Sequence, residues 1–434
     1  MTFAEPTRRS TRLLAGRIVA ICALVTAISQ FYRNAHVVVA PDIMGDTGIT
    51  AQTLGYLSGA LFLTAAALQI PAGILLDRYG PRRTIPFMLA TVVAGSLLFA
   101  SAQDATGLIV ARICMGVGLA AIGMAAIVAS TRWFAPAYFG TVVGVILGVS
   151  YIGHLASTLP MAQVSAAIGW RSSYVLVTIV TAVLAAAAAI LVRDAPPHHP
   201  FHSRIPETLA AAWRGVGEIL RVRDLWPLLA IAGTAYAVVA CILGLWAGPY
   251  LFDLYGLDAA ARGAVIIWFP VGMMLGNMLI SPLDRVLDTR KRIIVVCALA
   301  TVAILLALAV TPRPPLLVVT ISFGVLGFLS AYTTVIIAHG RCFYSDRQMG
   351  RGVTVVNTAV LLGAGTLQAV TGLIAGALAP GAASLPSEVY RIIFATLAAV
   401  LLAALFIYRR CPDVPPSAGA DGTRKPSAEQ GDSP

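Results

Sequence analysis

Long apolar runs alternate with short polar stretches along almost the whole chain. A helix that crosses the hydrocarbon core of a membrane needs about 20 apolar residues. Twelve runs meet this length, at residues 17–41, 52–76, 84–103, 107–129, 138–163, 173–192, 226–251, 263–283, 293–311, 315–337, 352–378 and 388–408. The pattern predicts an all-α integral membrane protein with twelve transmembrane helices.

The longest polar interruption, residues 194–225, divides the runs into two sets of six. It predicts an N-terminal six-helix bundle (1–193), a cytoplasmic linker and a C-terminal six-helix bundle (226–410), with an amphipathic helix in the linker near 206–222. The segment 411–434 is rich in Pro, Ser and Gly, which predicts a disordered cytoplasmic tail.

Composition supports a membrane protein, because 58% of the residues are apolar and only 11% are charged. The net charge of +11 has a topological explanation rather than a nucleic-acid one. With the N-terminus in the cytoplasm, 24 of the 30 Lys and Arg residues fall on the cytoplasmic side, as the positive-inside rule requires. Both termini are therefore expected to be cytoplasmic. The Ala- and Arg-rich, Lys-poor composition is typical of a bacterial inner-membrane protein, and the six cysteines indicate no disulfide framework.

The loop between the second and third runs carries a specific motif. The stretch 73–83 reads Gly-x-Leu-x-Asp-Arg-x-Gly-x-Arg-Arg, formed by Gly73, Asp77, Arg78, Gly80, Arg82 and Arg83. It resembles the helix 2–3 loop of the major facilitator superfamily of secondary transporters, and departs from it at Pro81, where a basic residue is usual. In the fourth run, Arg112 followed by small residues resembles a second motif of that family, with Met115 in place of its glutamine. The Gly-Pro pair of drug–proton antiporters is missing, since Val149 follows Gly148, which counts against drug efflux.

The second half repeats the first weakly. Asp77-Arg78 recurs as Asp284-Arg285, 207 residues later, and Arg132 and Gly140 recur as Arg341 and Gly350 at offsets of 209 and 210. Nearly constant offsets indicate an internal duplication, and two parallel repeats are how this superfamily is built. Arg112 has no counterpart, because Thr320 stands 208 residues on.

The resemblance implies transport by alternating access. In the family, the carboxylate at Asp77 faces the start of helix 11 across the cytoplasmic gate. The residues expected to gate are Gly73, Asp77, Arg78, Gly80, Arg82, Arg83, Asp284 and Arg285. No Zn-protease, nucleophile-elbow or phosphate-loop motif is present, so we expect neither an enzyme nor an ATP-driven pump.

Charges within the apolar runs indicate the substrate. Arg33, Arg112, His36 and His154 lie at similar depths, about 8–14 Å below the outer surface at 1.5 Å per residue, and no Asp or Glu lies in the interior of any run. An intramembrane arginine normally faces a cavity or a partner, and its planar fork matches a carboxylate or phosphate. These residues, with Asn34, predict a site for a small anion. Two alternatives stay open: Arg112 is held by helix 1 carbonyls as a structural arginine, and Arg33 reaches outward to the membrane surface.

The second half is expected to supply the opposite wall of the substrate cavity. Its polar and aromatic candidates are Tyr236, Trp246, Asn277, Tyr332 and Gln368. His36 or His154 is the candidate for proton coupling, since no buried acid is available; a histidine with satisfied polar contacts is the alternative.

Other functions are weaker alternatives. They are a drug or metabolite efflux carrier, a copper importer that uses Met274, Met278, Met161 and His154, and a sensor or scaffold that has lost transport. We expect a monomer in the lipid bilayer with a small-molecule substrate and no cofactor, metal site or nucleic-acid partner.

Overall fold

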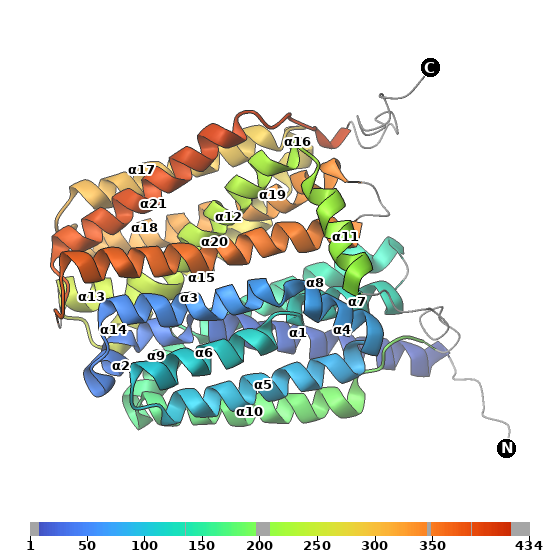
Figure 1. Ribbon diagram of the computed structural model, residues 1–434, viewed down its shortest axis with the longest axis horizontal. Helices are drawn as coiled ribbons and strands as arrows, with labels where there is room; N and C mark the ends of the chain where they lie inside the picture. The colour runs from blue at the N-terminus through green and yellow to red at the C-terminus, as the bar shows by residue number, and fades with distance from the viewer. Residues whose placement is uncertain (1–7, 135, 197–208, 345–348, 383, 418–434) are drawn as a thin grey trace.

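The computed structural model describes residues 8–134, 136–196, 209–344, 349–382 and 384–417, and these residues form helices without any strand (Figure 1). The helices of the first half are α1 (Arg8–Val38), α2 (Ala40–Thr47), α3 (Ala51–Ala67), α4 (Gln69–Tyr79), α5 (Pro81–Ser101), α6 (Ala105–Leu119), α7 (Ile122–Trp133), α8 (Pro136–Ala156), α9 (Leu159–Ile168) and α10 (Trp170–Leu191). After α11 (Leu209–Leu220), the second half contains α12 (Leu225–Cys241), η2 (Ile242–Trp246), α13 (Ala247–Tyr255), α14 (Ala259–Ile266), α15 (Trp268–Leu279), α16 (Leu283–Val286), α17 (Lys291–Val310), α18 (Leu316–Leu329), α19 (Tyr332–Gly340), η3 (Arg341–Phe343), α20 (Met349–Leu378) and α21 (Ser387–Tyr408).

The number of membrane-crossing helices agrees with the sequence pattern. Within the described residues, eleven helical stretches are long and apolar enough to cross a membrane, and the bent pair α3–α4 makes twelve. That pair bends by 51°. Other spans are interrupted rather than strongly bent, such as α8–α9, where Pro160 in the first turn of α9 has no N–H for the preceding helix. The prediction of twelve spans is confirmed, and their interruptions were not predicted.

The two halves form separate layers with α11 crossing from one to the other (Figure 1). Helix α11 is the amphipathic linker helix expected near 206–222; residues 197–208 of the linker lie outside the described part. The repeated landmarks occupy equivalent places, since Arg132 lies in the last turn of α7 and Arg341 follows directly on α19. The halves thus share a helical framework, as the repeat predicts.

The halves meet most extensively where α3 packs against α20, a blue and an orange helix side by side in Figure 1. A Cβ atom on Gly55 would lie 2.6 Å from the Gly372 Cα, and one on Gly59 would lie 2.6 Å from the Gly365 carbonyl oxygen. The backbones approach this closely only because these positions lack side chains. We call this contact the glycine seam.

A second contact closes the end of the molecule opposite the chain termini. Arg262 of α14 is 1% exposed, and its Nε and Nη2 atoms donate to the Val38 carbonyl at 3.1 and 3.0 Å. Its Nη2 also donates to Asp42 of α2 at 2.9 Å. A Cβ on Gly248 would lie 1.9 Å from the Val37 oxygen, so α13 and α1 are in backbone contact beside it. We call the Arg262–Val38–Asp42 contact the outer latch.

The start of the C-terminal segment is ordered. Asp413 accepts hydrogen bonds from the Thr289 hydroxyl at 2.7 Å and from the Lys291 N–H at 3.2 Å. The Ser417 hydroxyl and N–H donate to Asp288, which lowers the pKa of that carboxyl below its usual value. The expectation of a structureless tail from 411 is therefore wrong for residues 411–417, because the loop before α17 binds them. Residues 418–434 lie outside the described part.

Candidate substrate site

Arg112 on α6 is completely buried inside the N-terminal half. Its Nη1 donates to the Tyr32 carbonyl of α1 at 2.8 Å, and its Nε donates to the Leu57 carbonyl of α3 at 3.2 Å. Its Nη2 is buried and has no hydrogen-bond partner among the described residues. Two carbonyl oxygens offset part of the cost of a guanidinium in the membrane interior. This geometry favours the structural alternative for Arg112, in which helix 1 holds it.

Arg33 on α1 is held differently. Its guanidinium carbon lies 5.3 Å from the centre of the Phe62 ring of α3, and its Nε is buried without a partner. Among the described residues it forms no hydrogen bond and no ion pair. An aromatic face attracts a cation without using any of its N–H groups. Arg33 is therefore positioned by Phe62 and keeps its N–H groups for another acceptor.

The direction in which Arg33 is accessible follows from its neighbours along α1. Arg33 is half-buried, whereas the next turns toward the latch are fully buried, from Val37 at 2% to Ala40 at 0% exposure. Buried turns of α1 therefore separate the exposed part of the Arg33 side chain from the latched end. The guanidinium lies beside the buried Phe62 ring, with its Nε buried, and not at the latched end.

Asn34 and His154 connect α1 to α8 beside Arg33. The Asn34 Nδ2 lies 2.9 Å from the His154 Nδ1 and also donates to the Gln30 carbonyl. In this amide orientation, the His154 Nδ1 accepts, so the imidazole proton sits on Nε2. Arg33 is close enough to His154 for an electrostatic interaction. Three of the predicted site residues therefore form one cluster.

Gln368 brings the C-terminal half to the same place. Its Nε2 donates to the Ala240 carbonyl at 2.8 Å and, more weakly, to the Gly244 carbonyl at 3.4 Å. A Cβ on Gly244 would lie 3.1 Å from the Gln368 Nε2 and 3.2 Å from the Asn34 Oδ1. Gly244 belongs to the π-helical turn η2, and such turns occur often at functional sites. The Gly244 backbone therefore lies between the side-chain amides of Asn34 and Gln368.

His36 lies one turn beyond Arg33 and faces α3. Its Nε2 is 2.7 Å from the Ser58 hydroxyl, which itself donates to the Leu54 carbonyl. Since the hydroxyl proton is used, the His36 Nε2 is the donor in this contact. Its Nδ1 is buried and has no hydrogen-bond partner in the described part of the chain. His36 thus has one hydrogen-bond partner, Ser58 of α3, and does not belong to the Asn34–His154 cluster.

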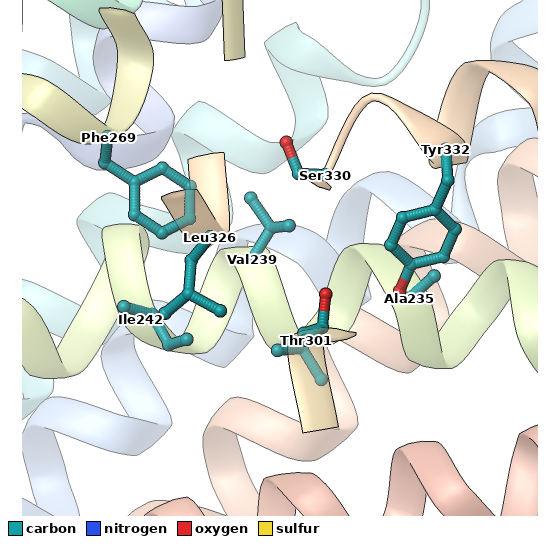
Figure 2. A pocket seen from close by; sticks show the side chains of 9 residues that line it. Ala235, Val239, Ile242, Phe269, Thr301, Leu326, Ser330 and Tyr332 are labelled. Atoms are coloured by element: carbon teal, nitrogen blue, oxygen red, sulfur yellow. The ribbon is translucent and has the colours of Figure 1, made fainter. Parts of the chain in front are cut away.

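Three candidates of the second half lie elsewhere. Trp246 donates to the Thr371 hydroxyl at 2.9 Å and stacks edge-on with Tyr390, inside the C-terminal half. Tyr332 lines a separate cavity of about 10 Å³, large enough for one water molecule, together with Ser330 and Thr301 (Figure 2). Asn277 accepts from Thr334 at 2.7 Å between α15 and α19. The structure does not bring these three to Arg33.

Tyr236, by contrast, joins the Arg33 cluster, and two aromatic residues that the sequence did not single out lie with it. The Tyr236 ring is 6.2 Å from the Phe62 ring, edge to face. Tyr151, one turn before His154 on α8, has its ring 6.0 Å from that imidazole and lies near Tyr236. The signal for Tyr151 was its spacing of three residues from His154, which puts both on one helix face.

The predicted gating residues gather at the end that carries the termini. Gly80 adopts φ 74°, a conformation that favours glycine, and caps α4. The neighbouring Arg82 N–H donates to Asp194 at 2.8 Å, and Gly73 packs against Met124 of α7. Asp77 is half-buried in the last turn of α4, and Arg78, Arg82 and Arg83 are exposed. In the second half, Asp284 is buried 3.5 Å from Arg290, and Arg285 is exposed.

Comparison with known proteins agrees with this architecture. The sequence model of the Major Facilitator Superfamily matches residues 22–365. The chain is 25% identical over 388 residues to the nitrate/nitrite transporter NrtP of Picosynechococcus sp., covering 76% of this chain and 68% of the relative. It is 25% identical over 288 residues to the probable L-galactonate transporter of Escherichia coli, covering 62% of each chain, so the match spans less than two thirds of that relative. A bacterial homologue of the human lysosomal transporter Spinster, solved inward-facing and occupied, superimposes with a TM-score of 0.73 at 16% identity, covering 94% of this chain and 97% of that one.

The fold, with its long apolar helices, is that of a multi-pass membrane protein. The chain belongs to the major facilitator superfamily, as the match to its family model shows.

Proposed function

We propose that this protein moves a small organic anion across a bacterial inner membrane by alternating access, with both termini in the cytoplasm. The observation that carries the proposal is Arg33, a guanidinium inside the bundle with no acidic partner among the described residues. An arginine fork binds a carboxylate through two parallel hydrogen bonds. The anions that related chains are named for, nitrate and L-galactonate, agree with this charge.

The proposed cycle uses the contacts between the two halves. The outer latch and the glycine seam hold the halves together in the present structure, and Asp77 is proposed to gate the opposite end. Tyr236 and Gln368 come from the second half, whereas Arg33, Asn34 and His154 come from the first. An anion on Arg33 would thus contact both halves and bias their relative position, which transport requires.

The test is uptake into proteoliposomes. We expect Arg33→Ala to abolish anion uptake, because one or two charge-assisted hydrogen bonds are worth about 1.5–3 kcal/mol each. Arg33→Lys should retain part of it, since the charge stays but the fork is lost. Arg313→Ala, which removes an exposed arginine stacked on Tyr255, is the matched control. Wild-type uptake in both Arg33 variants would discard the anion site.

A further inference from the structure

The cluster offers a substrate one accessible positive charge, that of Arg33. Arg112 is fully buried and donates to two carbonyls, while Arg33 is half-buried and donates to none among the described residues. Arg112 keeps one N–H group, on Nη2, without a partner among the described residues, but its guanidinium is fully buried and held by two carbonyls, so a second negative charge on the substrate could not reach it as it reaches Arg33, and an unpaired buried charge is costly. The cluster therefore suits a monoanion better than a dicarboxylate or a phosphate.

The polar donors around Arg33 are largely in use. The Asn34 amide nitrogen serves Gln30 and His154, and the Gln368 amide nitrogen serves Ala240 and Gly244. Each hydroxyl of a polyhydroxylated substrate needs its own partner, or loses free energy when it leaves water. The amide oxygens of Gln30 and Gln368 remain without a partner among the described residues, so the site offers only a few such partners, fewer than a substrate with a hydroxyl on every carbon needs.

Aromatic side chains are what the site offers instead. Tyr151 of α8 and Tyr236 of α12 are both half-buried, whereas Phe62 is 1% exposed and occupied by Arg33. Phe62 thus positions Arg33, and the two tyrosines, one from each half, present ring faces and hydroxyl groups. Planar rings between aromatic side chains gain free energy beyond the area they bury.

We infer that the substrate is an aromatic monocarboxylate, with its carboxylate on Arg33 and its ring between Tyr151 and Tyr236. This inference rests on the proposed anion transport and narrows it to one chemical class. Tyr151 and Tyr236 are the residues that determine specificity, and Phe62 is a positioning residue.

The experiment measures binding to the purified full-length protein by isothermal titration calorimetry. The probes are phenylacetate, cyclohexylacetate of similar size without a π-system, gluconate, succinate and inorganic phosphate. We expect phenylacetate to bind most tightly, and to lose binding in Arg33→Ala. Tyr236→Leu and Tyr151→Leu should each weaken phenylacetate about 2- to 12-fold and leave cyclohexylacetate nearly unchanged. Phe87→Leu, at an aromatic residue 59% exposed on α5, is the control for the same chemical change.

The outcomes separate the two proposals. Arg33-dependent binding of gluconate, succinate or phosphate, without phenylacetate, keeps the anion site and overturns the aromatic substrate. Phenylacetate affinity that is unchanged in both tyrosine variants also overturns it. If no probe binds in an Arg33-dependent way, and Arg33 variants transport anions normally, the proposed function itself fails.

Discussion

Removal of the outer latch should open the end of the protein opposite the termini. In Arg262→Gln, the two hydrogen bonds to the Val38 carbonyl and the ion pair with Asp42 are lost. The Asp42 side chain is 47% exposed, so its ion pair contributes only about 0–1 kcal/mol. The buried bonds to Val38 have a charged donor, and we assign them about 2 kcal/mol together.

These contributions set the size of the expected effect. A loss of about 2–3 kcal/mol from the closed state raises the ratio of open to closed molecules about 30- to 150-fold. In Asp42→Asn, the bonds to Val38 remain, so the ratio should rise at most about fivefold. Comparison of the two variants thus separates the buried bonds from the surface ion pair.

The assay is a distance distribution between spin labels on the two halves at the latched end. Exposed Gln103 and Thr311 are changed to cysteine and labelled, and Cys342, the exposed member of the six native cysteines, is changed to serine. We expect a longer distance to become dominant in Arg262→Gln. Arg391→Gln removes an arginine whose hydrogen bond, among the described residues, is to Ala309 of its own half, and should leave the distribution unchanged. Equal distributions in wild type and Arg262→Gln would refute the latch.

Three further predictions concern the same cycle. Gly248→Ala should disfavour the latched state and lower the melting temperature, because its new Cβ would stand 1.9 Å from the Val37 oxygen; a thermal melt that matches wild type contradicts this. Asp77→Asn should insert into the membrane normally but transport poorly, as measured by uptake normalised to the amount of protein in the vesicles, and full activity would exclude the gate. His36→Ala with His154→Ala should abolish proton-driven uptake while downhill exchange persists; proton-driven uptake that survives in the double variant removes both histidines as proton carriers.

The fold was predictable because length and apolarity alone decide whether a segment can cross a membrane. The interruptions within spans were not, since the π-turn at Gly244 lies against the Asn34 and Gln368 amides, which are distant in sequence. Such contacts join residues more than a hundred positions apart and leave no local pattern.

Residues of the candidate site could be predicted from the sequence where a polar or charged side chain interrupts an apolar run. Arg33 and His154 are polar groups in apolar runs and were found for that reason. Phe62 and Tyr151 resemble ordinary packing residues, so their place beside Arg33 emerged only from the structure. Tyr332 lies apart from this cluster, because the position of a residue in a span does not reveal whether its side chain faces the other half or its own.

The glycine seam has a consequence for leakage. Where Gly55 meets Gly372 and Gly59 meets Gly365, the two backbones lie directly against each other, so a change in the angle between α3 and α20 displaces few side chains. A small tilt can therefore keep the two surfaces in van der Waals contact. In the proposed cycle, lipid tails and hydrated ions would then stay out of the boundary between the halves, and the membrane would remain sealed.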